Sequence, residues 1–323
     1  MGRCSARRRR CRCCSTPRRR CVDRTAIRRS GGDRHLCRPW SEPQPRVAAR
    51  VEGSAGGHRR LRRRPRRRRF VTPADAVVRE ITDAGGQAVA CCASVAEEHS
   101  AGQIVDTALE TFGRIDAVIN NAGIHDPGLF ADLSVDQFRT MLDVHFFGTL
   151  FVARAAWPHF VRAGYGRVVN TVSDAMFGGF PELSSYGSAN AAVFGLTGNL
   201  ATQGLPHGIR VNAIAPRAYT RLSATHSDKV AEVMSMTKET MDEVNASMPP
   251  DLCAPAAAFL AHESCPLNGE VLQTGMGSVA RIAVVFSQGI WRSPMTIEDI
   301  AENIATIMNL GDAGVTNAAA PRM

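Results

Sequence analysis

The sequence predicts an α/β fold built on a doubly wound parallel sheet. From about residue 72 onward, short apolar runs alternate with longer segments of helical period, as expected when strands and helices succeed one another. Several apolar runs end directly in polar residues, the position where ligands bind beyond the carboxyl ends of parallel strands. A change of composition near residue 70 separates this pattern from an arginine-rich segment.

The arginine-rich segment covers residues 1–69 and is expected to stand outside the fold. It holds 25 Arg, no Lys and only 4 acidic residues, whereas residues 70–323 hold 14 basic and 26 acidic residues. We interpret it as disordered, or as GC-rich coding DNA read in a shifted frame, which would produce Arg, Pro, Cys and Gly without Lys. A basic arm that binds nucleic acid is the alternative, although nucleic acid is not the expected partner. A zinc site is disfavoured, because the cysteines lack paired spacing.

The first elements follow in order after residue 71. Thr72 and Pro73 suit the start of a helix that ends at a glycine pair. The next segment, "QAVAC", has the composition of a short strand, and residues 97–113 place Ile104, Val105 and Leu109 on one helical face. The apolar run at 115–120 is predicted to be a strand.

The second half continues the alternation. We expect a long amphipathic helix at 134–164, a strand at 166–173, a helix at 184–208, a strand at 209–216, helices at 228–245 and 254–261, and a last strand in "GEVLQTG" at 269–275. These elements predict a domain over 70–285 and a C-terminal extension over 286–323.

Candidate functional residues lie at the predicted strand ends. "NNAG" at 120–123 follows one strand, Ser173 ends the next, and Tyr186 follows Ser173 by thirteen positions at the start of an Ala-rich helix. Asn190 lies one helical turn after Tyr186. From these residues alone, Tyr186 is either a proton-transferring tyrosine or a packed residue at a helix start, and "NNAG" is either a ligand-binding turn or an ordinary one.

The ordered set of NNAG, Ser173, Tyr186 and "NAIAP" resembles the short-chain dehydrogenase/reductase family over about residues 72–280. "LAHESCPLNGEVLQTGMGSVARI", "NAIAPRAYTRL" and His145 in "VHFFGT" are similar to the (3R)-hydroxyacyl-CoA dehydrogenase part of peroxisomal multifunctional enzyme type 2 and its bacterial relatives. The resemblance implies a Rossmann-like fold. It also implies hydride transfer between a nicotinamide cofactor and a secondary alcohol or ketone; the cofactor is NAD or NADP, with NAD favoured. The implied small-molecule substrate is a 3-hydroxyacyl-CoA or is hydroxysteroid-like.

The resemblance also implies residue roles. Tyr186 would act as general acid/base, Ser173 would hydrogen-bond the reacting oxygen, and His145 would belong to the proton relay. Asn190 occupies the position of a lysine that lowers the pKa of the tyrosine and holds the nicotinamide ribose. The cofactor-binding residues implied are Asn120, Ala122, Gly123, Ser94, Tyr186, Asn190, Pro216 and Thr220.

Two departures from the family pattern bear on activity. Asn190 offers a hydrogen bond but no charge, which predicts low or specialised turnover. The first strand and its glycine-rich loop, which bind the pyrophosphate, have no counterpart in residues 1–69, so the N-terminal β-α-β unit is missing or unrecognisable. The alternative function is therefore a catalytically impaired dehydrogenase fold carrying a basic nucleic-acid-binding arm.

The remaining expectations concern partners and location. The histidines show no metal-ligand spacing, so no metal is expected. No apolar run approaches the length of a membrane span, which together with unpaired cysteines predicts a cytoplasmic protein without a membrane partner. The helical segments 134–161 and 185–205 resemble those that form the family's dimer face, so a homodimer or homotetramer is expected.

Overall fold

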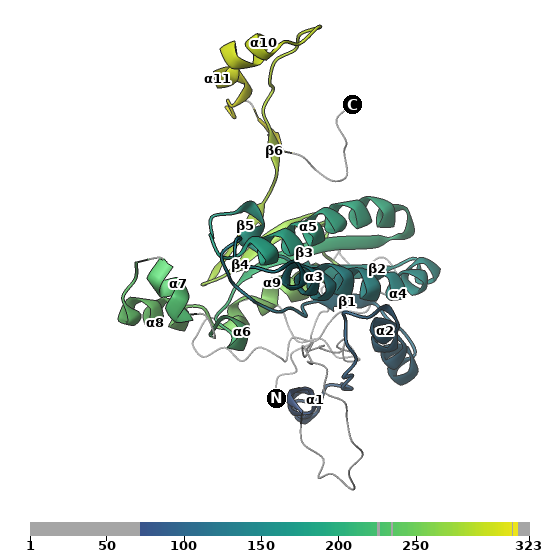
Figure 1. Ribbon diagram of the computed structural model, residues 1–323. Helices are drawn as coiled ribbons and strands as arrows, with labels where there is room; N and C mark the ends of the chain where they lie inside the picture. The colour runs from purple at the N-terminus through teal and green to yellow at the C-terminus, as the bar shows by residue number, and fades with distance from the viewer. Residues whose placement is uncertain (1–71, 225–226, 234, 312, 316–323) are drawn as a thin grey trace, which may run out of the picture.

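The structure is a computed structural model that describes residues 72–224, 227–233, 235–311 and 313–315. The predicted fold class is confirmed: within these residues a five-stranded sheet has the order β1-β2-β3-β4-β5, and β1 to β4 run parallel (Figure 1). The strands are β1 (Ala117–Asn120), β2 (Gly166–Thr171), β3 (Ile209–Arg217), β4 (Val271–Gly275) and β5 (Ser278–Ile282). The interpretation of residues 1–69 lies outside the described residues.

Helices cover both faces of this sheet. One face packs against α2 (Glu98–Phe112), α4 (Gly148–Ala163) and α5 (Ser184–Gly204), and the other packs against α9 (Ala254–Leu260). Alternation along β2 divides its side chains between the two layers, so that Val168 joins the first core and Val169 joins the second. Burial on both faces explains the nearly continuous apolar sequence of the strands.

The first described helix, α1 (Pro73–Asp83), begins where the sequence predicts. The side chain of Thr72 accepts a hydrogen bond from the Asp75 backbone N–H at 3.2 Å, and the Asp75 carboxylate accepts one from the Thr72 N–H at 2.9 Å. This reciprocal capping satisfies donors that a helix start leaves free. None of the residues in α1 is buried, so local capping rather than core packing defines this helix.

The predicted strand in "QAVAC" is wrong. Residues 87–91 form no strand, and within the described residues no strand pairs with the outer edge of β1. A strand exists only through pairing with a neighbour, so strand-like composition alone does not produce one. As a result β1 is an edge of the sheet, and the Ile119 side chain is 42% exposed.

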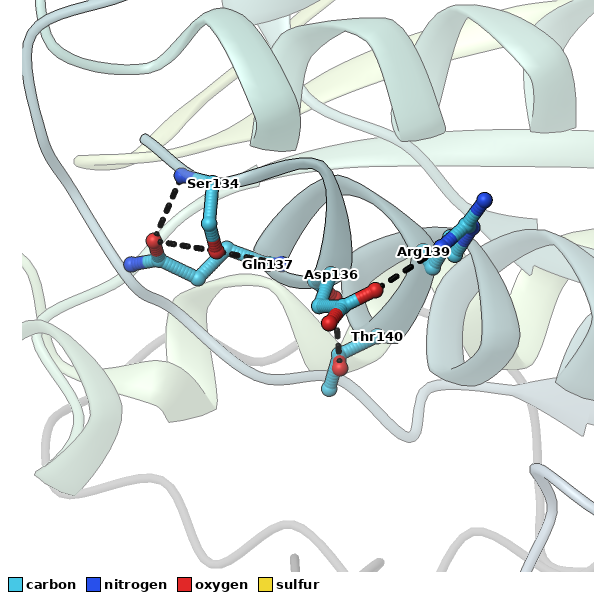
Figure 2. A network of polar contacts seen from close by, with 5 residues as sticks. All are labelled: Ser134, Asp136, Gln137, Arg139 and Thr140. Atoms are coloured by element: carbon cyan, nitrogen blue, oxygen red, sulfur yellow. Dashed lines mark hydrogen bonds and ion pairs between the residues drawn. The ribbon is translucent and has the colours of Figure 1, made fainter. Parts of the chain in front are cut away.

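The start of the predicted long helix is well defined (Figure 2). Ser134 caps α3 (Val135–Leu142) through hydrogen bonds exchanged with Gln137, whose side-chain oxygen lies 2.9 Å from the Ser134 nitrogen. On the exposed side of the same turn, Arg139 binds the Asp136 carboxylate at 2.8 Å. Capping fixes where α3 begins, while an exposed ion pair of this kind contributes little to stability.

The segment 134–164 was predicted to be one long helix, but it is not a uniform α-helix. A π-helical segment, η1 (Asp143–Phe147), joins α3 to α4. Such a segment inserts a residue into the helical repeat, and π-bulges occur often at functional sites. His145 lies in the middle of η1 and is buried.

The expected helix at 228–245 is not continuous. It is divided into α7 (Ser227–Val233) and α8 (Lys238–Ala246), because Ser235 adopts a left-handed conformation with φ 52°. They follow α6 (Arg221–Ala224) and lie at the opposite end of the molecule from α4 (Figure 1). Short 3₁₀ segments complete this half: η2 (Asp174–Phe177), η3 (Leu205–His207) and η4 (Pro250–Leu252).

The prediction that "GEVLQTG" is the last strand is wrong. β4 turns back into the antiparallel strand β5 through Met276 and Gly277, whose φ values are 51° and 74°. Two consecutive residues with positive φ form the hairpin turn that suits the twist of paired strands. Beyond β5, β6 (Val285–Phe286) pairs with β7 (Gly314–Val315). Between these two strands in the sequence lie α10 (Ile297–Glu302) and α11 (Ile304–Ile307), which stand away from the sheet (Figure 1).

Candidate active site

The candidate site lies beyond the carboxyl ends of the parallel strands. The NNAG segment follows β1, Ser173 follows β2, and Pro216 belongs to the end of β3. Parallel strands present these ends along the same edge of the sheet, and α5 adds Tyr186 from its first turn. Residues separated by more than sixty positions therefore meet in one region.

Ser173 starts the segment η2 and is held there by its own side chain. Its Oγ accepts a hydrogen bond from the Ala175 N–H at 3.2 Å. Helix α5 comes unusually close to this segment, because a Cβ added at Gly187 would lie 2.5 Å from the Ala175 carbonyl oxygen. Glycine at 187 thus permits the approach that brings Tyr186, the adjacent residue, to Ser173.

Tyr186 is partly buried and its hydroxyl is surrounded by polar groups. Burial raises the pKa of Tyr186 above its ordinary value of 10.0, and the Asp174 carboxylate raises it further. Hydrogen bonding with the side chains of Ser173 and Asn190 lowers the pKa of Tyr186, but less than burial raises it. The hydroxyl therefore keeps its proton at neutral pH and can donate it.

Asn190 is tied to the same helical turn as Tyr186. It is only 1% exposed, and its Nδ2 donates a hydrogen bond to the Tyr186 backbone carbonyl at 2.9 Å. An amide can be buried in this way at little cost, because its donor is satisfied. It adds no positive charge, so the tyrosinate form gains no ionic stabilisation from position 190.

His145 is buried beside Tyr186. Its Nε2 lies 2.9 Å from the Ile124 carbonyl oxygen and 3.1 Å from the Ile124 nitrogen, and its ring stands edge-on to the Tyr186 ring at 5.2 Å. Burial lowers the pKa of His145, and the hydrogen bond to Ile124 opposes that shift in part. A neutral imidazole that is held by the backbone can position neighbouring groups without adding charge.

The position of the His145 ring leaves room only for a glycine at residue 123. A Cβ added at Gly123 would lie 2.7 Å from Cε1 of His145, far inside the normal contact distance. The family resemblance implies that Gly123 binds the cofactor; in the structure the imidazole of His145 occupies the space beside it.

His125 was not expected at the site. The sequence indicated no role for it at the site, yet its ring stands edge-on to Tyr186 with centroids 5.1 Å apart. Tyr186 is thus flanked by two imidazoles, His125 and His145. The signal that could have found His125 is its position, two residues after the NNAG segment at the end of β1.

The other predicted cofactor-binding residues are spread over two places. Asn120, Ala122, Pro216 and Thr220 line a cavity of about 470 Å³ along the edge of β1. Ser94 lies outside that lining and accepts a hydrogen bond from the Ala96 N–H at 3.2 Å.

The amide of Asn120 serves the protein as well as the cavity. Its Nδ2 donates to Asn170 Oδ1 at 3.0 Å, and Asn170 Nδ2 donates to Thr197 Oγ1 at 2.9 Å. Asn170 and Thr197 are fully buried, so this chain of hydrogen bonds fixes the end of β1 against β2 and α5.

The cavity has the composition of a small-molecule site. It lies at the carboxyl ends of β1 and β3, is mostly apolar, and includes the polar groups of Asn120, Asn121 and Thr220, the composition typical of small-molecule sites. Tyr186 and Ser173 are not part of its lining. In the described part of the chain no glycine-rich turn leads from a strand into a helix, so these residues include no pyrophosphate-binding turn of that kind.

The residues that the structure describes contain no group of three or more His, Cys, Asp or Glu side chains arranged to hold a metal ion. In the same residues no helix is both long and apolar enough to cross a membrane.

Comparison with known proteins places this geometry in a family. A model described as "short chain dehydrogenase" matches residues 68–231. The chain is 38% identical over 245 residues to a putative short-chain type dehydrogenase/reductase of Mycobacterium tuberculosis, covering 75% of this chain and 80% of that protein. It is 34% identical over 248 residues to peroxisomal multifunctional enzyme type 2 of Mus musculus, covering 74% of this chain but 31% of that protein.

A reductase and a solved structure agree with these matches. The chain is 30% identical over 201 residues to a 3-oxoacyl-[acyl-carrier-protein] reductase of Synechocystis, covering 61% of this chain and 81% of that protein. The crystal structure of a short chain dehydrogenase from Mycobacterium avium superposes with a TM-score of 0.60 at 28% identity, over 73% of this chain and 78% of that one.

The chain therefore belongs to the short-chain dehydrogenase/reductase family and is an oxidoreductase that acts on a small molecule. The resemblance read from the sequence is confirmed, including the likeness to peroxisomal multifunctional enzyme type 2. Members of this family use NAD or NADP as cofactor.

Proposed function

We propose that this protein transfers a hydride between NAD(P) and a secondary alcohol or ketone, and that its substrate is a 3-hydroxyacyl or 3-oxoacyl thioester such as a 3-hydroxyacyl-CoA. The observation that carries the proposal is the hydrogen bond between the side chains of Tyr186 and Ser173 near the strand ends. The name of the Synechocystis relative, a 3-oxoacyl-[acyl-carrier-protein] reductase, supports a thioester substrate.

Each residue has a distinct part in the proposed reduction. Tyr186 holds the proton that the carbonyl oxygen receives, because burial keeps its hydroxyl protonated. Ser173 donates a hydrogen bond to the same oxygen and stabilises the charge that develops there. The cofactor, when bound, supplies the hydride.

The remaining predicted residues orient these groups. His145 fixes the Tyr186 ring from one side and connects it to the Ile124 backbone. Asn190 would reach the nicotinamide ribose by hydrogen bonding, and Asn120, Ala122, Gly123, Pro216 and Thr220 would hold the nicotinamide end. Ser94 would lie near the adenine, as the family resemblance implies. NAD is preferred over NADP in this proposal.

The test uses the full chain with acetoacetyl-CoA, measuring nicotinamide absorbance with NADH and separately with NADPH. We expect oxidation of NADH that depends on the thioester and is faster than oxidation of NADPH. A 3-ketosteroid provides the second arm. Turnover with the steroid alone would overturn the thioester assignment but keep the oxidoreductase.

Assembly and location remain predictions for this chain. A homodimer or homotetramer through α4 and α5 would appear as a doubled or fourfold mass in light scattering. A cytoplasmic location would be tested by fractionation, because peroxisomal proteins are among the relatives.

A further inference from the structure

The carboxylate of Asp174 joins the ends of three neighbouring strands. Asp174 directly follows Ser173 after β2, and its Oδ2 accepts hydrogen bonds from Nη2 of Arg217 at 3.4 Å and from Nε2 of Gln273 at 3.3 Å. Arg217 is the last residue of β3, and Gln273 lies in β4. The carboxylate therefore lies among polar side chains at the same edge of the sheet as the candidate site.

The fold fixes the backbone from which Arg217 reaches this carboxylate. Arg217 lies opposite Gly275 of β4, and a Cβ added at Gly275 would overlap the Arg217 carbonyl oxygen. The thiol of Cys253 donates a hydrogen bond to the same oxygen at 3.6 Å. Only glycine at 275 allows so close an approach, so the position of Arg217 is set by the packing of β3 against β4.

Asp174 also bears on the hydroxyl of Ser173. Its Oδ1 lies 3.4 Å from Ser173 Oγ, and the same Oγ accepts a hydrogen bond from the Ala175 N–H at 3.2 Å. A serine hydroxyl has one proton to donate, and an ionised carboxylate only accepts. At 3.4 Å the contact is long for a bond between two oxygens, so it can direct the proton of Ser173 without withholding it from a substrate oxygen.

Asp174 acts on Tyr186 as well, because its carboxylate raises the pKa of the tyrosine. Titratable side chains reach Tyr186 from three segments around it: His125 after β1, His145 in η1 and Asp174 in η2. Burial lowers the pKa of His145, and α5 has no charged residue along its length. On α3, which packs against α5, the charges of Asp136 and Arg139 pair with each other. A change in the charge of Asp174 therefore acts directly on the tyrosine.

We propose that Asp174 is a positioning residue that orients the hydroxyl of Ser173, and that Arg217 balances its charge beside the tyrosine. An uncompensated carboxylate would oppose both the tyrosinate and the negative charge that develops on a substrate oxygen. Arg217 thus supplies, through Asp174, positive charge that Asn190 does not. The role in turnover rests on the proposed function, whereas the balance of charge at Tyr186 can be measured without it.

The exposure of the pair favours an electrostatic role over a structural one. The side chains of Arg217 and Asp174 are 51% and 38% exposed, and ion pairs at such positions contribute little to stability. Substitution of either residue is therefore expected to leave the fold intact. Asp116, which pairs with Arg114 just before β1, is similarly exposed at 44%. It lies at the amino end of the strands, away from the candidate site, so Asp116→Asn is the matched control.

The first test is a spectroscopic pH titration of Tyr186 in the full-length protein without cofactor. Tyrosinate absorbance is recorded for each variant and for the same variant carrying Tyr186→Phe, so that the difference isolates one tyrosine. We expect Asp174→Asn to lower the titration midpoint by about half a pH unit or more, and Arg217→Gln to raise it. The double variant should lie between them, and Asp116→Asn should match the wild type.

The second test is the pH profile of 3-hydroxybutyryl-CoA oxidation by NAD, in which Tyr186 must accept a proton. At a given pH below the midpoint, Asp174→Asn should be about threefold faster than the wild type, because more tyrosinate is present, and Arg217→Gln should be slower. Asparagine keeps an oxygen that can accept from Ser173, whereas alanine does not. Asp174→Ala should therefore move the midpoint as Asp174→Asn does but have a lower kcat than Asp174→Asn.

Each part of the proposal has a result that contradicts it. Midpoints that do not move, or that move in the same direction in Asp174→Asn and Arg217→Gln, would refute the balance of charge. Equal kcat in Asp174→Asn and Asp174→Ala would refute the orientation of Ser173. A higher KM for the thioester in Arg217→Gln with an unchanged midpoint would make Arg217 a substrate-binding residue instead. If the wild type does not oxidise 3-hydroxybutyryl-CoA, the proposed function fails, while opposite shifts in the titration would still support the balance of charge.

Discussion

The side-chain amide of Asn190 donates a hydrogen bond to the backbone carbonyl of Tyr186, one helical turn earlier, at 2.9 Å. This bond places a neutral, satisfied group where the family resemblance implies a lysine. The consequence is chemical rather than structural: α5 is intact, but the hydroxyl of Tyr186 has no cation on the next turn. Burial then determines the direction in which the pKa of Tyr186 shifts, which is upward.

Restoring a positive charge at position 190 should raise activity. An ammonium group beside Tyr186 lowers the pKa of the hydroxyl, and each unit of pKa corresponds to about 1.4 kcal/mol, roughly a factor of ten. We expect Asn190→Lys to increase kcat for alcohol oxidation at neutral pH by about tenfold. Methionine is similar in length to lysine but carries no charge, so Asn190→Met should give no increase in kcat. Equal gains from both variants would exclude a charge effect.

Tyr186 should also make stability depend on alkaline pH. Its pKa in the folded protein is raised, so the unfolded chain releases this proton first, at about pH 10. The stabilisation is complete below that pH and is lost as pH rises toward the folded pKa. The free energy of unfolding of Tyr186→Phe, measured in urea, should therefore decline less steeply above about pH 10 than that of the wild type. Identical slopes would contradict the shift.

His145 should make stability depend on acidic pH. Its pKa in the folded protein is lowered by burial, so below about pH 6.5 the unfolded chain binds a proton that the folded protein does not. Stability is retained above that pH and falls as pH decreases toward the folded pKa. His145→Asn should flatten this acid decline in urea unfolding, while substitution of the exposed His207 by Asn serves as the control. An unchanged profile for His145→Asn would refute the assignment.

The contact between Gly123 and His145 predicts a steric effect. Gly123→Ala would bring a methyl group 2.7 Å from the imidazole and should lower the free energy of unfolding by about 1–3 kcal/mol, the usual cost of overpacking. The matched control is Gly102→Ala in α2, where nothing lies within 4 Å and the helix should gain about 0.5–1 kcal/mol. Equal effects of the two substitutions in thermal unfolding would rule out the contact.

The buried amide network should be equally sensitive. Asn170→Ala leaves both Asn120 and Thr197 without the partner that now joins them, which should cost about 1–3 kcal/mol. Asn199→Ala removes only an exposed side chain that bonds to its own helix and should be nearly neutral. If both variants unfold at the same urea concentration, the network does not stabilise the fold as argued.

The sequence predicted most of the fold because apolar alternation and capping are local signals. Thr72 and the run at 166–171 could be assigned without knowledge of their partners. Segment 87–91 could not, because its composition suits a strand while the described structure provides no neighbour to pair with. The β4–β5 hairpin depends on positive φ at Met276, a residue type that does not predict that conformation.

The same division holds for the site. Ser173, Tyr186 and Asn190 could be brought together from their spacing and the family resemblance. His125 could not, since its contact with Tyr186 depends on how the chain turns after β1. The role of Gly123 also emerged only from packing, because the sequence does not show which side chain lies against a glycine.

The most direct test of the account is the rate of acetoacetyl-CoA reduction by NADH in the full chain, in Tyr186→Phe and in Ser173→Ala, with circular dichroism confirming that each variant is folded. General acid catalysis typically contributes about 10²–10⁴-fold. We predict measurable turnover in the wild type, a fall of at least about a hundredfold in Tyr186→Phe, and a smaller fall in Ser173→Ala. Retention of the wild-type rate by Tyr186→Phe would contradict the proposed mechanism.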